Sequence, residues 1–166
     1  IIDGDDLQKR ELASLANPSN SLRSWELLES SMNSTSGMKA AAFEKNGQIV
    51  FTFRGTEPAP QFTLIDMVRD IYTDLQLALP DAPLGEPNQF RDAYNFVKST
   101  IESVTGYSMT NAQLASYVQT HNIEFVGHSL GGALVQYVIA ELGAGHGTTF
   151  NAVGIGQVLD IADTSV

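Results

Sequence analysis

Hydrophobic residues lie at strand spacing in four stretches of the chain, namely 38–44, 48–54, 123–126 and 148–153. The first two stretches are joined by Lys45-Asn46-Gly47, and Asn-Gly between apolar strands is a strong signal for a tight hairpin turn. We therefore expect a β-hairpin followed, much later, by two buried strands.

Apolar residues at helical spacing fill most of the chain between these strands. Helices are predicted from near Thr63, over the stretch that begins near Phe90, over 110–119 and after a five-residue turn that follows Val126. The core face of the second helix is expected to contain Phe90, Tyr94, Val97, Ile101 and Val104. Residues 22–31, which include Trp25, are predicted to form a short helix or an apolar loop.

Helices that alternate with buried strands indicate an α/β fold with a largely parallel sheet. With 166 residues, the chain is expected to form a single domain, 1–166. In such sheets, ligands and catalytic groups gather at the carboxyl ends of the strands. Chemistry is therefore sought where the predicted strands end.

Composition and charge exclude several classes of function. Nine basic against nineteen acidic residues give a formal charge of −10, which argues against nucleic-acid binding and gives no electrostatic attraction to anionic membranes. No apolar run is long enough for a transmembrane segment. Cysteine is absent, which excludes disulfides and thiolate metal sites. An aspartate stripe at 66, 70 and 74 is interpreted as a solvated helix face, and no cofactor or metal is implied.

The sequence Gly127-His128-Ser129-Leu130-Gly131 has the G-x-S-x-G form of a nucleophile elbow. It follows the predicted strand at 123–126 and precedes a helical pattern. A serine between strand and helix needs a strained backbone, and glycines on either side leave room for it. Ser129 is therefore the candidate nucleophile of an acyl-transfer enzyme, with the helix start behind it favouring an oxyanion.

Four motifs together resemble the class 3 lipases, which are α/β-hydrolases of the fungal triacylglycerol lipase type. They are Phe53-Arg-Gly-Thr56, Asp70-Ile-Tyr-Thr-Asp74-Leu75, Gly127-His-Ser-Leu-Gly-Gly132 and Thr149-Phe-Asn-Ala152. The Arg-Gly-Thr motif, followed by a proline-rich gap and a helix with two aspartates, looks particularly like bacterial lipases and phospholipases exported by type I secretion. The resemblance covers roughly residues 37–156. Two motif positions depart from the family without touching the chemistry, since Ile71 stands where Trp is usual and Asn88-Gln89-Phe90 lacks a usual His and Gly.

This resemblance implies a role for individual residues. Ser129 matches the nucleophile, Thr56 matches one oxyanion-hole residue, and Leu130 matches the second through its backbone N–H. Residues 57–80 match the region of the lid or its hinge. The implied substrate is a lipid or small ester, triacylglycerol or phospholipid, and the implied location is outside the cell, with the cytoplasm as the alternative.

A general base for Ser129 is missing from the sequence. This fold orders its triad as Ser, Asp or Glu, then His, and no histidine follows His146. His146 precedes any acid and is rejected, while Asp160 and Asp163 come earlier than the family's acid. We therefore expect a truncated α/β-hydrolase domain that lacks its C-terminal part and has little turnover alone. The alternatives are a non-catalytic hydrolase-like binding module and another acyl hydrolase or acyltransferase.

Overall fold

The computed structural model describes residues 24–31, 36, 38–55, 89–152 and 154–155. In chain order, the elements are β1 (Glu26–Ser31), β2 (Ala40–Lys45), β3 (Gln48–Phe53), α3 (Gln89–Thr105), α4 (Asn111–Thr120), β4 (Asn122–His128), α5 (Leu130–Leu142) and β5 (His146–Phe150). The predicted helix near Thr63 lies outside the described residues.

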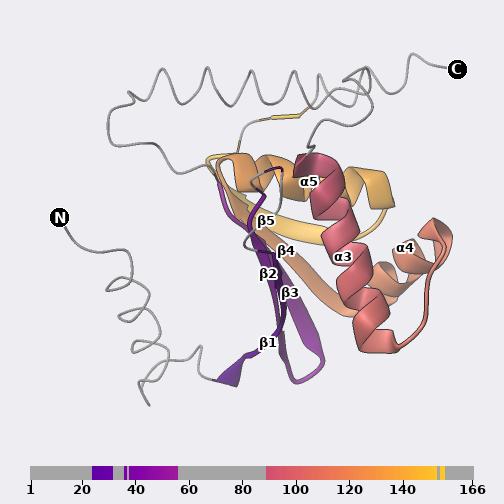
Figure 1. Ribbon diagram of the computed structural model, residues 1–166. Helices are drawn as coiled ribbons and strands as arrows, with labels where there is room; N and C mark the ends of the chain where they lie inside the picture. The colour runs from indigo at the N-terminus through magenta and orange to yellow at the C-terminus, as the bar shows by residue number, and fades with distance from the viewer. Residues whose placement is uncertain (1–23, 32–35, 37, 56–88, 153, 156–166) are drawn as a thin grey trace, which may run out of the picture.

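The described strands form one sheet in the order β1-β2-β3-β4-β5. β1, β2 and β3 pair antiparallel, whereas β3, β4 and β5 pair parallel. The sheet is therefore mixed within the described residues, and the expectation of a largely parallel sheet is wrong there. The α/β class itself agrees with the structure, because the parallel strands are linked through helices that pack on the sheet (Figure 1).

The predicted hairpin is confirmed as β2 and β3. Its turn residues, Asn46 and Gly47, both have positive φ, at 53° and 80°. This is the backbone of a type I′ turn, whose twist matches that of the strands it joins, and asparagine and glycine tolerate it best. The Glu44 carboxylate accepts a hydrogen bond from the Gly47 N–H at 2.7 Å and closes the turn.

β1 corrects the prediction of a short helix or loop at 22–31. This strand pairs antiparallel with β2 at the edge of the sheet, and its register shifts between Leu27 and Glu29. None of its six residues is fully buried. An edge strand with a bulge and no buried face lacks the alternation that identifies strands in a sequence, so only the pairing with β2 reveals it.

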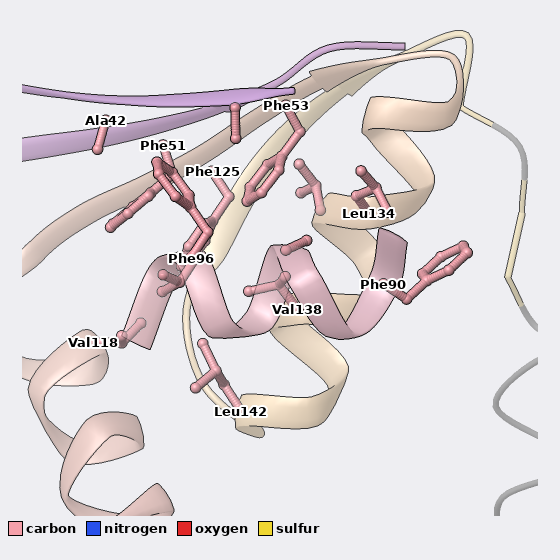
Figure 2. Packing of buried hydrophobic residues seen from close by; sticks show 14 of the residues in the cluster. Ala42, Phe51, Phe53, Phe90, Phe96, Val118, Phe125, Leu134, Val138 and Leu142 are labelled. Atoms are coloured by element: carbon pink, nitrogen blue, oxygen red, sulfur yellow. The ribbon is translucent and has the colours of Figure 1, made fainter. Parts of the chain in front are cut away.

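The hydrophobic core lies on one face of the sheet. The buried strand residues on that face are Ala40, Ala42, Ile49, Phe51, Phe53, Ile123 and Phe125. Figure 2 shows the rings of Phe51, Phe53 and Phe125 facing side chains of α3 and α5, and in Figure 1 all three described helices lie on this side. Phe51 stacks on Phe125 with ring centroids 5.5 Å apart and meets Phe96 edge-on at 6.1 Å. This aromatic cluster joins β3, β4 and α3.

α3 buries a somewhat different face from the predicted one. Phe90, Val97 and Ile101 are buried as expected, together with Ala93, Phe96 and Thr100, which the prediction omitted. Val104 is 47% exposed, so its assignment to the core is wrong.

Two half-buried tyrosines occupy the seam between α3 and α5. Tyr137 packs edge-on against Phe90, with ring centroids 5.2 Å apart. Burial, followed by the negative charge of Glu141, raises the pKa of both Tyr94 and Tyr137 above the usual value. Both hydroxyls are therefore neutral at physiological pH, and the Tyr94 hydroxyl is buried without a hydrogen-bond partner among the described residues.

β5 begins two residues earlier than predicted and is not buried. All five of its residues are exposed, in contrast to the buried strand expected at 148–153. It has β4 as its only neighbour in the described sheet. Gly147 and Thr149, the residues facing α5, are too small to contribute to the core. The apolar residues of 148–153 therefore predicted more burial than β5 has.

We predict that Phe125→Ala lowers the free energy of unfolding by about 3–5 kcal/mol, because it removes a fully buried ring and leaves a cavity beside Phe51. Urea unfolding followed by circular dichroism measures the change. Phe150→Ala is the matched control, since the ring of Phe150 is 55% exposed, and it should change stability by no more than about 0.5 kcal/mol. Equal losses in the two variants would contradict the one-sided core.

Candidate active site

Ser129 occupies the single-residue turn between β4 and α5. Its backbone has φ 54° and ψ −123°, outside the allowed regions for a residue with a side chain. Such a conformation costs of order 1–3 kcal/mol and persists only where the surroundings enforce it. The predicted strand, turn and helix are all present, with the serine at the carboxyl end of a strand flanked on both sides by others.

Two glycines allow this turn. A Cβ at Gly127 would lie 2.2 Å from the Gly131 carbonyl oxygen, and a Cβ at Gly131 would lie 2.1 Å from the carbonyl oxygen of Phe53. Real Cβ atoms do not approach backbone atoms this closely. The first turn of α5 therefore packs directly on the ends of β3 and β4, and only glycine fits at either position.

Gly55 brings the loop after β3 against the candidate nucleophile. A Cβ there would lie 3.2 Å from the Ser129 Cβ and 3.6 Å from the Leu130 nitrogen. The chain leaving β3 thus passes beside both the serine and the first N–H of α5. The side chain of Thr56, the next residue, lies outside the described residues. Its assignment to the oxyanion hole stays a prediction.

Hydrogen bonds hold the backbone of Ser129 on both sides. Its N–H donates to the Phe150 carbonyl of β5 at 2.9 Å, and its carbonyl accepts from the N–H groups of Gly132 and Ala133. Its side chain makes no capping hydrogen bond and is partly exposed. The hydroxyl is therefore available to a ligand while the backbone beneath it is fixed.

Leu130 begins α5 with its side chain buried. The first N–H groups of a helix have no intrahelical acceptor, and the helix dipole places partial positive charge beside them. The Leu130 N–H therefore lies next to Ser129 as a donor for a developing oxyanion. The assignment of Leu130 to the oxyanion hole stays a prediction.

None of the described histidines is positioned as a base for Ser129. His121 stacks on Tyr117 at 3.7 Å between centroids, and its Nδ1 lies 2.9 Å from the Tyr117 carbonyl, before β4 begins. His146 pairs with Glu124, so it lies four residues, or about 13 Å, from the level of His128. His128 precedes the serine and is exposed. Asp160 and Asp163 lie outside the described residues.

Two site glycines were not singled out by the sequence interpretation. Gly55 appeared only as part of the Arg-Gly-Thr motif, and Gly132 as part of the elbow motif. A Cβ at Gly132 would lie 2.6 Å from the Ala152 Cβ, so this position brings the chain after β5 against α5. The sequence shows these glycines only as members of the Arg-Gly-Thr and elbow motifs. Which glycine has a close neighbour depends on the fold.

The side chain of Arg54, which follows β3, is exposed. Its backbone N–H donates to the Lys39 carbonyl at 2.9 Å and extends the β2–β3 pairing to the rim of the site. Among the described residues, no three acidic or histidine side chains gather to hold a metal ion. No helix in the same part of the chain could cross a membrane.

No protein-family model matches this sequence, and no curated protein matches it. Among solved structures, the chain is similar to a fungal lipase–inhibitor complex described as a model for interfacial activation in lipases, with 18% sequence identity and a TM-score of 0.41. The match covers 72% of this chain and 42% of that one. The chain thus spans less than half of that lipase, and so weak a likeness carries no argument about function.

We predict that Gly131→Ala lowers the free energy of unfolding by at least about 2–3 kcal/mol, because the new methyl group meets the Phe53 backbone, which cannot move without disturbing β3. Chemical denaturation measures the change. Gly154→Ala is the control, since a Cβ there has nothing within 4 Å. A neutral result for Gly131→Ala would show that α5 does not pack on the end of β3 as described.

Proposed function

We propose that this chain provides the nucleophile of a serine acyl-ester hydrolase of the lipase type. The observation that carries the proposal is the strained backbone of Ser129, held between β4 and α5 beside the first N–H of α5, with no capping hydrogen bond from its side chain. Strain of this kind is kept where the surrounding structure enforces it, commonly at catalytic sites. The four motifs that resemble class 3 lipases support lipid esters as the substrates.

In the proposed reaction, the Ser129 hydroxyl oxygen attacks the carbonyl carbon of an ester, and a general base takes the hydroxyl proton. The Leu130 N–H and a donor at Thr56 hold the negative charge that develops on the carbonyl oxygen. The base then gives its proton to the leaving alcohol, which leaves an acyl group on Ser129. A water molecule, deprotonated by the same base, releases the carboxylic acid and restores the serine.

The base and its acid partner are proposed to come from residues that this sequence does not include. The support is that His121 and His146 lie at the far end of β4 and β5 from Ser129. We further propose that residues 1–166 belong to a single α/β-hydrolase domain. Without a base, the oxyanion donors and the positioned serine would still provide a small part of the rate enhancement.

A second candidate is a hydrolase-like module that binds ligands without catalysis. The positions of the described histidines favour it, because no histidine side chain in the described part of the chain forms a hydrogen bond with Ser129. The strained serine, with three glycines packed around it, favours the catalytic alternative, since a binding module has no need of that strain. Another serine acyl-transfer reaction, such as peptide hydrolysis or acyl transfer to a second alcohol, would use the same groups. Profiling against esters and amides of different chain length separates these reactions.

We predict that p-nitrophenyl butyrate acylates Ser129 slowly, with little turnover, because attack is assisted by oxyanion donors but not by a base. Mass spectrometry of the intact chain and of its peptides should detect one butyryl group on Ser129. Ser129→Ala should abolish this adduct, whereas Ser116→Ala, a change at an exposed serine in α4, should leave it unchanged.

Either of two results would count against the proposal. Acylation that persists in Ser129→Ala would show that the elbow serine is not the nucleophile. Rapid steady-state hydrolysis by residues 1–166 that is lost in Ser129→Ala would keep the nucleophile but contradict the external base, and a base within the chain would then have to be found.

A further inference from the structure

A row of four residues crosses the outer face of the sheet beside Ser129. It consists of Lys39 before β2, Arg54 after β3, His128 at the end of β4 and Phe150 at the end of β5. We name it the outer-edge row. Arg54, His128 and Phe150 are exposed and Lys39 is partly exposed. The row is on the face opposite the described helices, at the same edge as the candidate nucleophile.

The strand register places these residues in line. Phe53 pairs with Ala40 on one side and with Gly127 on the other, so Arg54 lies level with Lys39 and with His128. His128 in turn pairs with Phe150. Phe53 and Ala40 are buried on the helix face. Their chain neighbours, Arg54 after Phe53 and Lys39 before Ala40, therefore point to the outer face.

Independent contacts confirm the orientation of β5. A Cβ at Gly132 of α5 would lie 3.3 Å from the Thr149 Cβ, so Thr149 is on the helix face. The Thr148 hydroxyl donates to the Glu124 carboxylate at 3.0 Å on the other face. Phe150 follows the same alternation and therefore points outward, where its ring is 55% exposed.

A shallow pocket of about 260 Å³ lies at the Lys39–Arg54 end of the row. It is lined by Lys39, Ala40, Ala41, Thr52, Phe53 and Arg54. The Thr52 hydroxyl already donates to the Ala41 carbonyl at 3.1 Å, and Lys39 and Arg54 are the cationic residues of the lining. Arg54 has other interactions as well. Its five N–H donors allow it to bind more than one acceptor. Pockets that enclose a whole small molecule measure roughly 300–1,000 Å³, so this one suits a single group of a larger ligand.

The charge of the pocket differs from that of the chain as a whole. The chain has a formal charge of −10, with only nine lysines and arginines, and two of these nine line this pocket. Lys39 and Arg54 lie level with each other on neighbouring strands, and an ammonium and a guanidinium both suit an oxygen-rich anion such as a carboxylate or a phosphate. On a chain with a formal charge of −10, such a pair provides a local attraction for anions.

Ser129 lies between the cationic and the apolar ends of the row. Adjacent strands are about 5 Å apart, so Arg54 is about 5 Å and Lys39 about 10 Å to one side of the serine's strand, while Phe150 is about 5 Å to the other side. An extended ligand across this edge could therefore place an anion in the pocket, an ester at Ser129 and an alkyl chain on Phe150.

We propose that the outer-edge row selects acyl esters that contain an anionic group, carboxylate or phosphate, about 5–10 Å from the ester carbonyl, with an alkyl chain on the opposite side. This proposal rests on the proposed function, because it takes Ser129 as the point of attack. It goes beyond that function by naming the chemical class of the substrate and the residues that recognise it. Binding to the row does not itself require turnover.

The test measures binding of three probes with equal chains to the full chain by NMR titration: hexyl phosphate, hexanoate and hexanol. Wild-type protein should bind the two anions several-fold more tightly than hexanol, with shifts at Ala41 and Thr52, and this preference should shrink in high salt. Lys39→Gln should weaken anion binding about three- to tenfold without changing hexanol binding. Phe150→Ala should weaken all three probes about three- to tenfold.

Lys45→Gln is the matched control, because Lys45 is at the opposite end of β2 and the variant has the same change in charge. It should leave anion binding unchanged. Equal affinity of wild-type protein for hexanol and the anions, or an equal effect of Lys39→Gln and Lys45→Gln, would overturn the proposal. The comparison of the three probes on wild-type protein tests the proposal even if a variant does not fold. Whichever of hexyl phosphate and hexanoate binds more tightly identifies the recognised group as a phosphate or a carboxylate.

Ser129→Ala separates this proposal from the proposed function. The variant removes the candidate nucleophile and should leave binding of all three probes unchanged. Anion binding in the row together with no acylation of Ser129 would keep the binding site and reject the enzyme. Acylation of Ser129 without anion preference would keep the enzyme and reject the row.

Discussion

The close approach of α5 to the ends of β3 and β4 is the constraint on which the candidate site depends. Gly127 and Gly131 touch backbone rather than side chains, so the contact has no room to adjust. Because the helix start cannot shift, Ser129 cannot relax to an ordinary backbone conformation, and the hydrogen bond to Phe150 fixes it from the other side. The strain at the serine is thus a consequence of the packing that surrounds it, and its side chain, at the edge of the sheet, makes no capping hydrogen bond.

The same packing explains why the core lies on one face of the sheet. Phe51 and Phe125 stack on neighbouring parallel strands, and α3 and α5 cover them. This face anchors β3 and β4 rigidly, and these are the strands whose carboxyl ends meet at Ser129. The outer face is free to differ in chemistry, which is why cationic, imidazole and aromatic side chains can line up there without disturbing the core.

Much of this was available from the sequence where local rules act alone. Asn46-Gly47 favours a type I′ turn in any context, and the stretch 123–142 predicts strand, turn and helix because apolar spacing changes at a glycine-flanked serine. β1 could not be predicted, since an edge strand with a bulge has no buried alternation. Val104 and β5 were predicted to be buried but are exposed. Apolar spacing shows which residues share a face of an element, not which of them another element covers.

The sequence by itself determined the hairpin, the elbow and its candidate nucleophile, because each depends on residues close together in the chain. The tertiary structure decided what those elements meet. It placed Gly55 against Ser129, made the sheet mixed, exposed Arg54 and aligned Lys39, Arg54, His128 and Phe150 across four strands. Register between strands far apart in sequence creates these neighbours, and register depends on the packing of the whole sheet rather than on any one segment.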